Sequence, residues 1–152
     1  MSLRVNESIE TRANRLAWAG LLPFIGTSVL ATFGLWTEFL LPVFLIYSAV
    51  ILSFLGGIHW GLVMAGKLEQ PERRLLICMA PSIVAWIAVA FLPELYALVI
   101  LAGVYLLWLN YDLAQVPEPW YERLRKPITF VVAGSHFIWF IAVVTALRTT
   151  GM

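Results

Sequence analysis

Long apolar segments alternate with short polar ones along this chain. Five of them have about the 20 residues that a helix needs to cross a bilayer: residues 16–36, 39–66, 75–91, 95–111 and 128–147. No segment alternates apolar and polar residues with the period of two that is typical of a transmembrane β-barrel. Because unpaired backbone groups are not tolerated in hydrocarbon, the pattern predicts an all-α integral membrane protein with a bundle of five transmembrane helices.

The composition agrees with this pattern and excludes an ordinary soluble domain. The chain has 152 residues, of which 61% are hydrophobic and 12% are charged, and its mean hydropathy is +0.87. The net charge is +1, so no strongly basic surface indicates a nucleic-acid partner. We therefore expect the lipid bilayer to be the main environment of the chain.

The basic residues predict an orientation. Nine of the ten fall on one side of the predicted spans, and one falls on the other: Arg4, Arg12, Arg15, Lys67, Arg73, Arg74, Arg123, Arg125 and Lys126 against Arg148. The positive-inside rule then predicts a cytoplasmic N-terminus and a periplasmic C-terminus. The domain organisation expected is a cytoplasmic tail (1–15), a single transmembrane domain (16–147) and a short periplasmic tail (148–152), in a bacterial inner membrane.

The second predicted span carries a stripe of small residues. Ser53, Gly57 and Gly61 recur every four residues, and small residues let two helix backbones approach closely in lipid. His59 is about 200° around the helix from Gly57 and so lies on nearly the opposite side. A helix with a packing stripe on one side and a polar side chain on the other is expected at the centre of the bundle.

The two histidines, His59 and His136, both fall inside predicted spans, where ionisable residues often mark function. Measured from Lys67 and Lys126, their depths are about 12 and 15 Å at about 1.5 Å per residue. They are expected to border one pocket open to the cytoplasmic leaflet.

Three other residues are candidate members of this ligand-binding site: Trp60, Ser48 and Thr129. The site could hold a b-type haem between two imidazoles, contact a quinone or similar lipophilic molecule, or handle protons. The alternative is that each histidine bonds a neighbouring hydroxyl or carbonyl and holds helices together.

A polar segment follows the fourth span. Asp112 is followed by Trp120, Arg123 and Arg125, a combination that is typical of a turn at the cytoplasmic interface, with an arginine pairing with Asp112 or with lipid phosphates. The alternative is a cytoplasmic ligand pocket built on Asp112 and Arg123. No enzyme motif is present, and the few candidate ligands do not predict a metal site.

Several of these motifs together resemble a known family. The run from Ser53 to Gly61, followed by Tyr111-Asp112 and by Trp120-Tyr121-x-x-Leu124-Arg125, is similar to a group of bacterial membrane proteins classed as a domain of unknown function. That group is related to eukaryotic transmembrane protein 69. The resemblance implies a small multi-spanning protein of bacterial inner membranes with a mitochondrial relative, and it implies no activity.

Two functional hypotheses follow. The first is a non-catalytic membrane protein that binds a lipophilic ligand or a partner subunit, where the partner is another membrane protein or a second copy of the chain. One version of this hypothesis is an accessory or assembly factor of a respiratory complex. The second is a small transporter or channel. Because a transport path should be polar across the whole membrane, and the outer halves of these spans are almost wholly apolar, the first is favoured.

Overall fold

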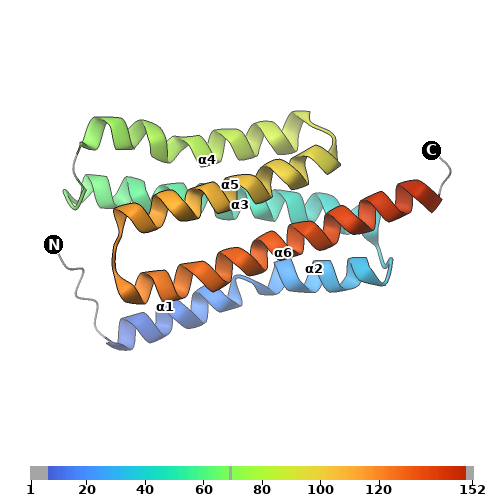
Figure 1. Ribbon diagram of the computed structural model, residues 1–152, viewed down its shortest axis with the longest axis horizontal. Coiled ribbons are helices and arrows are strands. Elements are labelled where there is room, and N and C mark those ends of the chain that lie inside the picture. Colours follow the sequence, from blue (N-terminus) through green and yellow to red (C-terminus); the bar gives the residue numbers. More distant parts are fainter. Residues whose placement is uncertain (1–6, 69, 150–152) are drawn as a thin grey trace.

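The computed structural model describes residues 7–68 and 70–149, and within them the chain is helical without any strand. The helices are α1 (Glu7–Ala19), α2 (Leu22–Thr32), α3 (Thr37–Met64), α4 (Pro71–Phe91), α5 (Glu94–Gln115) and α6 (Pro119–Thr149). Five helical segments are long and apolar enough to cross a membrane, and α1 with α2 forms the first of them (Figure 1). The predicted all-α bundle of five transmembrane segments is confirmed.

Prolines mark the start of the later helices. Pro71 and Pro119 are the first residues of α4 and α6, and Pro93 precedes the first residue of α5. Proline suits this position because the first backbone N–H groups of a helix have no partner within it and proline lacks one. These three starts set the positions of the turns and keep α3 to α6 antiparallel to their neighbours in the sequence.

The first predicted span, 16–36, differs from the structure at both ends. Helix begins already at Glu7, breaks between Ala19 and Leu22, and ends at Thr32. Pro23 explains the break, because its ring would clash with the carbonyl group four residues earlier in a continuous helix. Within this break, the carbonyl oxygen of Gly20 accepts a hydrogen bond from the Tyr47 hydroxyl at 2.9 Å.

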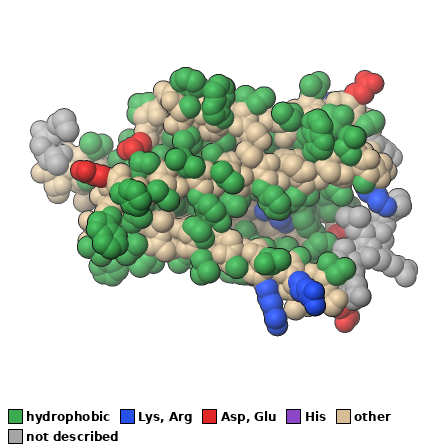
Figure 2. Space-filling view, turned by 180° about the vertical axis from the view of Figure 1, so that it is seen from behind, with side chains coloured by type: hydrophobic (Ala, Val, Ile, Leu, Met, Phe, Trp, Pro, Cys, Tyr) green, Lys and Arg blue, Asp and Glu red, His purple; other side chains and the backbone are tan. Residues whose placement is uncertain are grey.

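The two ends of the bundle differ in charge. One end contains the start of α1 and the α3–α4 and α5–α6 turns, and we call it the basic end because it bears the half-buried Arg74 and these exposed residues: Arg12, Arg15, Lys67, Arg73, Arg123 and Lys126. The other, the acidic end, bears Glu38 and Glu94 in the first turns of α3 and α5, and α6 reaches it with Arg148 in its last turn. Arg4 and residues 150–152 lie outside the described residues. Figure 2 shows hydrophobic side chains over most of one face, as expected for a surface in lipid.

Helix α3 packs against α2, α4 and α5, and its Phe44 ring lies 5.7 Å from that of Trp139 on α6. The small-residue stripe predicted to make these contacts does not make them. Ser53, Gly57 and Gly61 are exposed, and a Cβ atom added to either glycine would meet no other atom within 4 Å.

The close approach is at the neighbouring residue, Gly56. A Cβ atom there would lie 2.3 Å from the backbone oxygen of Cys78 on α4. Because successive residues are about 100° apart around a helix, the face that meets α4 is the one that bears Gly56 and not Gly57. The assignment of Ser53, Gly57 and Gly61 to packing within this chain is therefore wrong.

Candidate functional site

Four buried polar side chains from three helices meet near the basic end. The Asp112 carboxylate on α5 accepts a hydrogen bond from His59 Nε2 on α3 at 2.7 Å and from Arg125 Nε on α6 at 2.6 Å. The Tyr121 hydroxyl donates to the same carboxylate, at 2.9 Å from Oδ1 and 3.0 Å from Oδ2. We call His59, Asp112, Tyr121 and Arg125 the Asp112 cluster.

The helices bring these residues together for simple geometric reasons. Helices α3 and α5 run in the same direction, and His59 and Asp112 each lie in the last turns before the basic end. Tyr121 and Arg125 are four residues apart on α6, so both point to the same side of that helix. A buried carboxylate is stable only when paired and hydrogen-bonded, and here the guanidinium group compensates its charge.

A second polar cluster surrounds His136, deeper along the bundle. The ring Nδ1 donates to the Val132 carbonyl oxygen at 2.8 Å, which leaves Nε2 of the neutral ring to accept from the Ser48 hydroxyl at 2.9 Å. The Tyr105 hydroxyl donates to the Ser48 carbonyl oxygen at 2.8 Å. This His136 cluster (Ser48, Tyr105, Val132 and His136) joins α3, α5 and α6 and leaves neither ring nitrogen free.

The structure does not bring the two histidines together. Ser48, the partner of His136, precedes His59 by 11 residues on the same helix, which is about 16 Å along its axis. The expected equal depth fails because α6 begins at Pro119 and not near Lys126, so that His136 is about 25 Å from that end of its helix. An axial pair around one haem iron does not fit this arrangement, since both nitrogens of His136 are hydrogen-bonded within the protein.

A cavity of about 420 Å³ lies beside the Asp112 cluster. Helices α1, α2, α3, α5 and α6 all contribute to its wall, which is mostly apolar and includes these residues: Leu16, Ala17, Leu21, Phe24, Leu55, Ile58, Leu124, Ile128 and Val132. Arg125, Tyr121, Thr129, Tyr105 and Trp120 also line it. Ligand pockets typically have this size and this balance of apolar wall and few polar groups.

Among the residues that line the cavity, three polar atoms, all on α6, have no hydrogen-bond partner within the part of the chain that the structure describes. They are Arg125 Nη2, Thr129 Oγ1 and Trp120 Nε1. Arg125 is 6% exposed and Thr129 is 1% exposed, so water at the protein surface does not satisfy them. Buried polar groups without partners are costly and rare in native proteins, so these atoms call for a specific explanation.

The structure places the residues predicted from the sequence in different environments. Of the five candidate ligand contacts, Thr129 lines the cavity, His59 is buried on Asp112, Trp60 is exposed, and Ser48 and His136 bond each other. Of the four residues predicted at the cytoplasmic interface, Asp112 and Arg125 are buried, Trp120 is half-buried and Arg123 is exposed.

Sequence reasoning missed Tyr121 as a partner of Asp112 and Arg125 as part of a cavity wall. A signal for both was present, because Tyr121, Arg125 and Thr129 recur every four residues and therefore share one face of a helix. The signal was hidden because residues 119–127 are polar and had been expected to lie outside the membrane-spanning helix.

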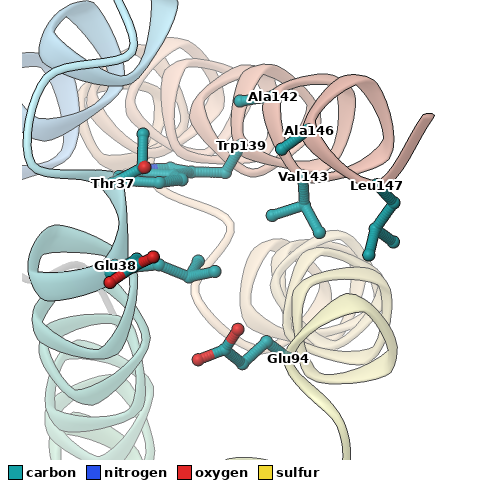
Figure 3. A pocket seen from close by; sticks show the side chains of 9 residues that line it. Thr37, Glu38, Glu94, Trp139, Ala142, Val143, Ala146 and Leu147 are labelled. Atoms are coloured by element: carbon teal, nitrogen blue, oxygen red, sulfur yellow. The ribbon is translucent and has the colours of Figure 1, made fainter. Parts of the chain in front are cut away.

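A separate hollow of about 290 Å³ lies at the acidic end. Figure 3 shows that Glu38 of α3 and Glu94 of α5 border it together with Val143 and Leu147 of α6. Both carboxylates are exposed, so they need no partner in this hollow. No group of three or more potential metal ligands (His, Cys, Asp, Glu) occurs within 7–68 and 70–149.

Comparisons with known proteins identify a family without a described activity. Residues 9–141 match the family model described as "Protein of unknown function (DUF3429)". The chain is 32% identical over 127 residues to Transmembrane protein 69 of Xenopus tropicalis, covering 79% of this chain and 50% of that protein. It is 29% identical over 132 residues to Transmembrane protein 69 of Mus musculus, covering 81% of this chain and 53% of that protein. The chain thus spans about half the length of these curated relatives, and no solved structure matches it.

Proposed function

The chain belongs to the DUF3429 family, and we propose that it binds a lipophilic ligand within its bundle of membrane-spanning helices. The observation that carries this proposal is the cavity of about 420 Å³ beside the Asp112 cluster. A well-packed bundle of this size leaves few voids larger than a water molecule, so a cavity that could hold a drug-sized molecule indicates an occupant.

The composition of the cavity wall supports a lipophilic occupant over a hydrated one. Its apolar side chains come from α1, α2, α3 and α6, and the polar groups are confined to a few positions on α5 and α6. A hydrated ion would need polar partners on several sides, whereas an apolar molecule replaces lipid contacts with protein contacts of the same kind.

The packing between the cavity and the acidic end favours binding over transport. Phe44, Leu41 and Trp139 are buried there, and the rings of Phe44 and His136 lie 4.7 Å apart. A path for a polar substrate would have to pass this apolar layer, where nothing replaces the water of hydration.

Orientation and location are part of the proposal. The charge asymmetry between the two ends supports a cytoplasmic basic end in a bacterial inner membrane. We expect activity from a phosphatase fused after Met152, when that phosphatase is one that works only outside the cytoplasm. Activity of a cytoplasm-specific reporter at the same position would contradict this orientation.

The ligand-binding proposal is tested by filling the cavity from α1. Ala17 lines the cavity, whereas Ala19 on the same helix is exposed and does not. Ala17→Phe should reduce the amount of lipophilic molecule that co-purifies in mild detergent, measured by mass spectrometry of an organic extract. Ala19→Phe is the matched control and should leave that amount unchanged. Equal amounts in the wild type and in both variants would refute an occupied cavity.

A further inference from the structure

We infer that the cavity takes an uncharged amphiphile whose head group presents a carbonyl oxygen, and that Arg125 and Thr129 hold this oxygen. The inference rests on the proposed function and adds the chemistry of the ligand and the residues that recognise it. It differs from the site expected around the two histidines, because neither histidine lines the cavity.

The first argument is the kind of polar atom left without a partner. A guanidinium nitrogen such as Arg125 Nη2 can only donate hydrogen bonds, and the Thr129 hydroxyl can also donate. Arg125 and Thr129 are four residues apart on α6, so both lie on the face that lines the cavity. Two neighbouring donors that are more than nine-tenths buried require an acceptor, and a carbonyl oxygen has two lone pairs to offer.

The second argument is charge. The positive charge of Arg125 is already compensated by Asp112, whose carboxylate lies 2.6 Å from Arg125 Nε. An anionic head group would therefore add an uncompensated negative charge in a low-dielectric site, and a cationic one would find no free acceptor on the carboxylate. An uncharged acceptor is the head group that satisfies the donors without adding charge.

The third argument is the direction of the cavity. Val132 follows Thr129 on the same face of α6 and, with Leu21 and Phe24 of the first segment, continues the wall away from the basic end. A ligand whose head lies at Arg125 and Thr129 would thus place its apolar body against these side chains. Both a benzoquinone ring and the ester of a glycerolipid present such a carbonyl on an apolar body.

The experiment measures dissociation constants, as mole fractions in detergent, from the ligand-dependent unfolding temperature of the purified chain. Five probes of similar chain length are compared: decylbenzoquinone, monodecanoylglycerol, decylbenzene, decanoate and decylammonium. We expect the carbonyl probes to bind at least about fivefold more tightly than decylbenzene, as one or two buried hydrogen bonds would give. The tighter of the two carbonyl probes identifies the source.

The variant that tests the residue assignment is Thr129→Val, which keeps the shape of the side chain and removes its hydroxyl. It should weaken binding of the better carbonyl probe about three- to tenfold and leave decylbenzene binding unchanged. Thr145→Val is the matched control, because Thr145 is exposed on the same helix outside the cavity, and it should bind like the wild type.

The outcomes separate the two proposals. If decylbenzene or decanoate binds as tightly as the carbonyl probes, or if Thr129→Val binds every probe like the wild type, the head-group inference is wrong while ligand binding stands. If no probe binds the folded wild type and Ala17→Phe also loses no co-purifying molecule, both proposals are wrong.

Discussion

Gly56→Ala is the most direct test of how α3 and α4 are held together. The added methyl group would be placed 2.3 Å from the Cys78 backbone oxygen, whereas ordinary van der Waals contacts begin near 3.4 Å. The obstructing atom belongs to the backbone of a helix and cannot turn away as a side chain would. The two helices must therefore separate by about 1 Å at this point, or the alanine must be strained.

The expected cost follows from this displacement. A gap of 0.5–1 Å forfeits roughly a quarter to a half of the dispersion energy of the contacts concerned, and overpacking in proteins typically costs about 1–3 kcal/mol. The measurement is the free energy of unfolding, from reversible denaturation of the purified chain in mixtures of mild detergent and dodecyl sulfate. We expect Gly56→Ala to lower it by an amount in that range.

Gly57→Ala is the matched control, because the same substitution is made one residue later, where the added methyl group faces open space. It should leave the free energy of unfolding unchanged or raise it by up to about 1 kcal/mol, since alanine favours a helix more than glycine does. Equal stability of Gly56→Ala and Gly57→Ala would refute the close approach of α3 and α4 at Gly56.

Two further predictions concern the polar clusters and use the same denaturation assay. Asp112→Ala leaves the Arg125 charge unpaired and should lower the free energy of unfolding by about 3–5 kcal/mol. The double variant Asp112→Ala/Arg125→Leu should recover part of that loss, because it also removes the unpaired charge. A double variant no more stable than Asp112→Ala would contradict charge compensation. Ser48→Ala removes the hydrogen bond to His136 and should cost about 0.5–1.7 kcal/mol, whereas Ser53→Ala, at an exposed serine of the same helix, should cost less. Equal losses for the two serine variants would mean that the Ser48–His136 bond contributes nothing to stability.

The number of transmembrane segments could be predicted because it depends on local composition. The second span was expected at 39–66, and α3 extends over Thr37–Met64. The start of α6 was missed because the polar residues 119–127 are typical of a loop. They are helical because Pro119 suits a helix start, Tyr121 and Arg125 are buried on Asp112, and Lys126 pairs with Glu122 one turn away.

The polar clusters could not be predicted because they depend on which helices face each other. The helical period shows that His59 and Gly57 lie on opposite sides of α3, but it does not say which neighbour each side meets. The pairing of His59 with Asp112 joins residues 53 positions apart in the sequence. Which of Gly56 and Gly57 contacts α4 could not be predicted either, because it depends on how α3 is rotated about its axis relative to α4.

The residues of the Asp112 cluster are synthesised one helix after another, and this order affects how the cluster assembles in the membrane. His59 and Asp112 emerge with α3 and α5, while Tyr121 and Arg125 emerge afterwards with α6. Until α6 has been synthesised, the Asp112 carboxylate has a single partner within the cluster and no compensating arginine. Its place near the end of α5 lets it remain close to the membrane surface during that interval. Insertion of α6 then brings the ion pair and the hydrogen bonds of Tyr121 and Arg125 to Asp112 together, so that the Asp112 cluster is complete only once this helix is in the membrane.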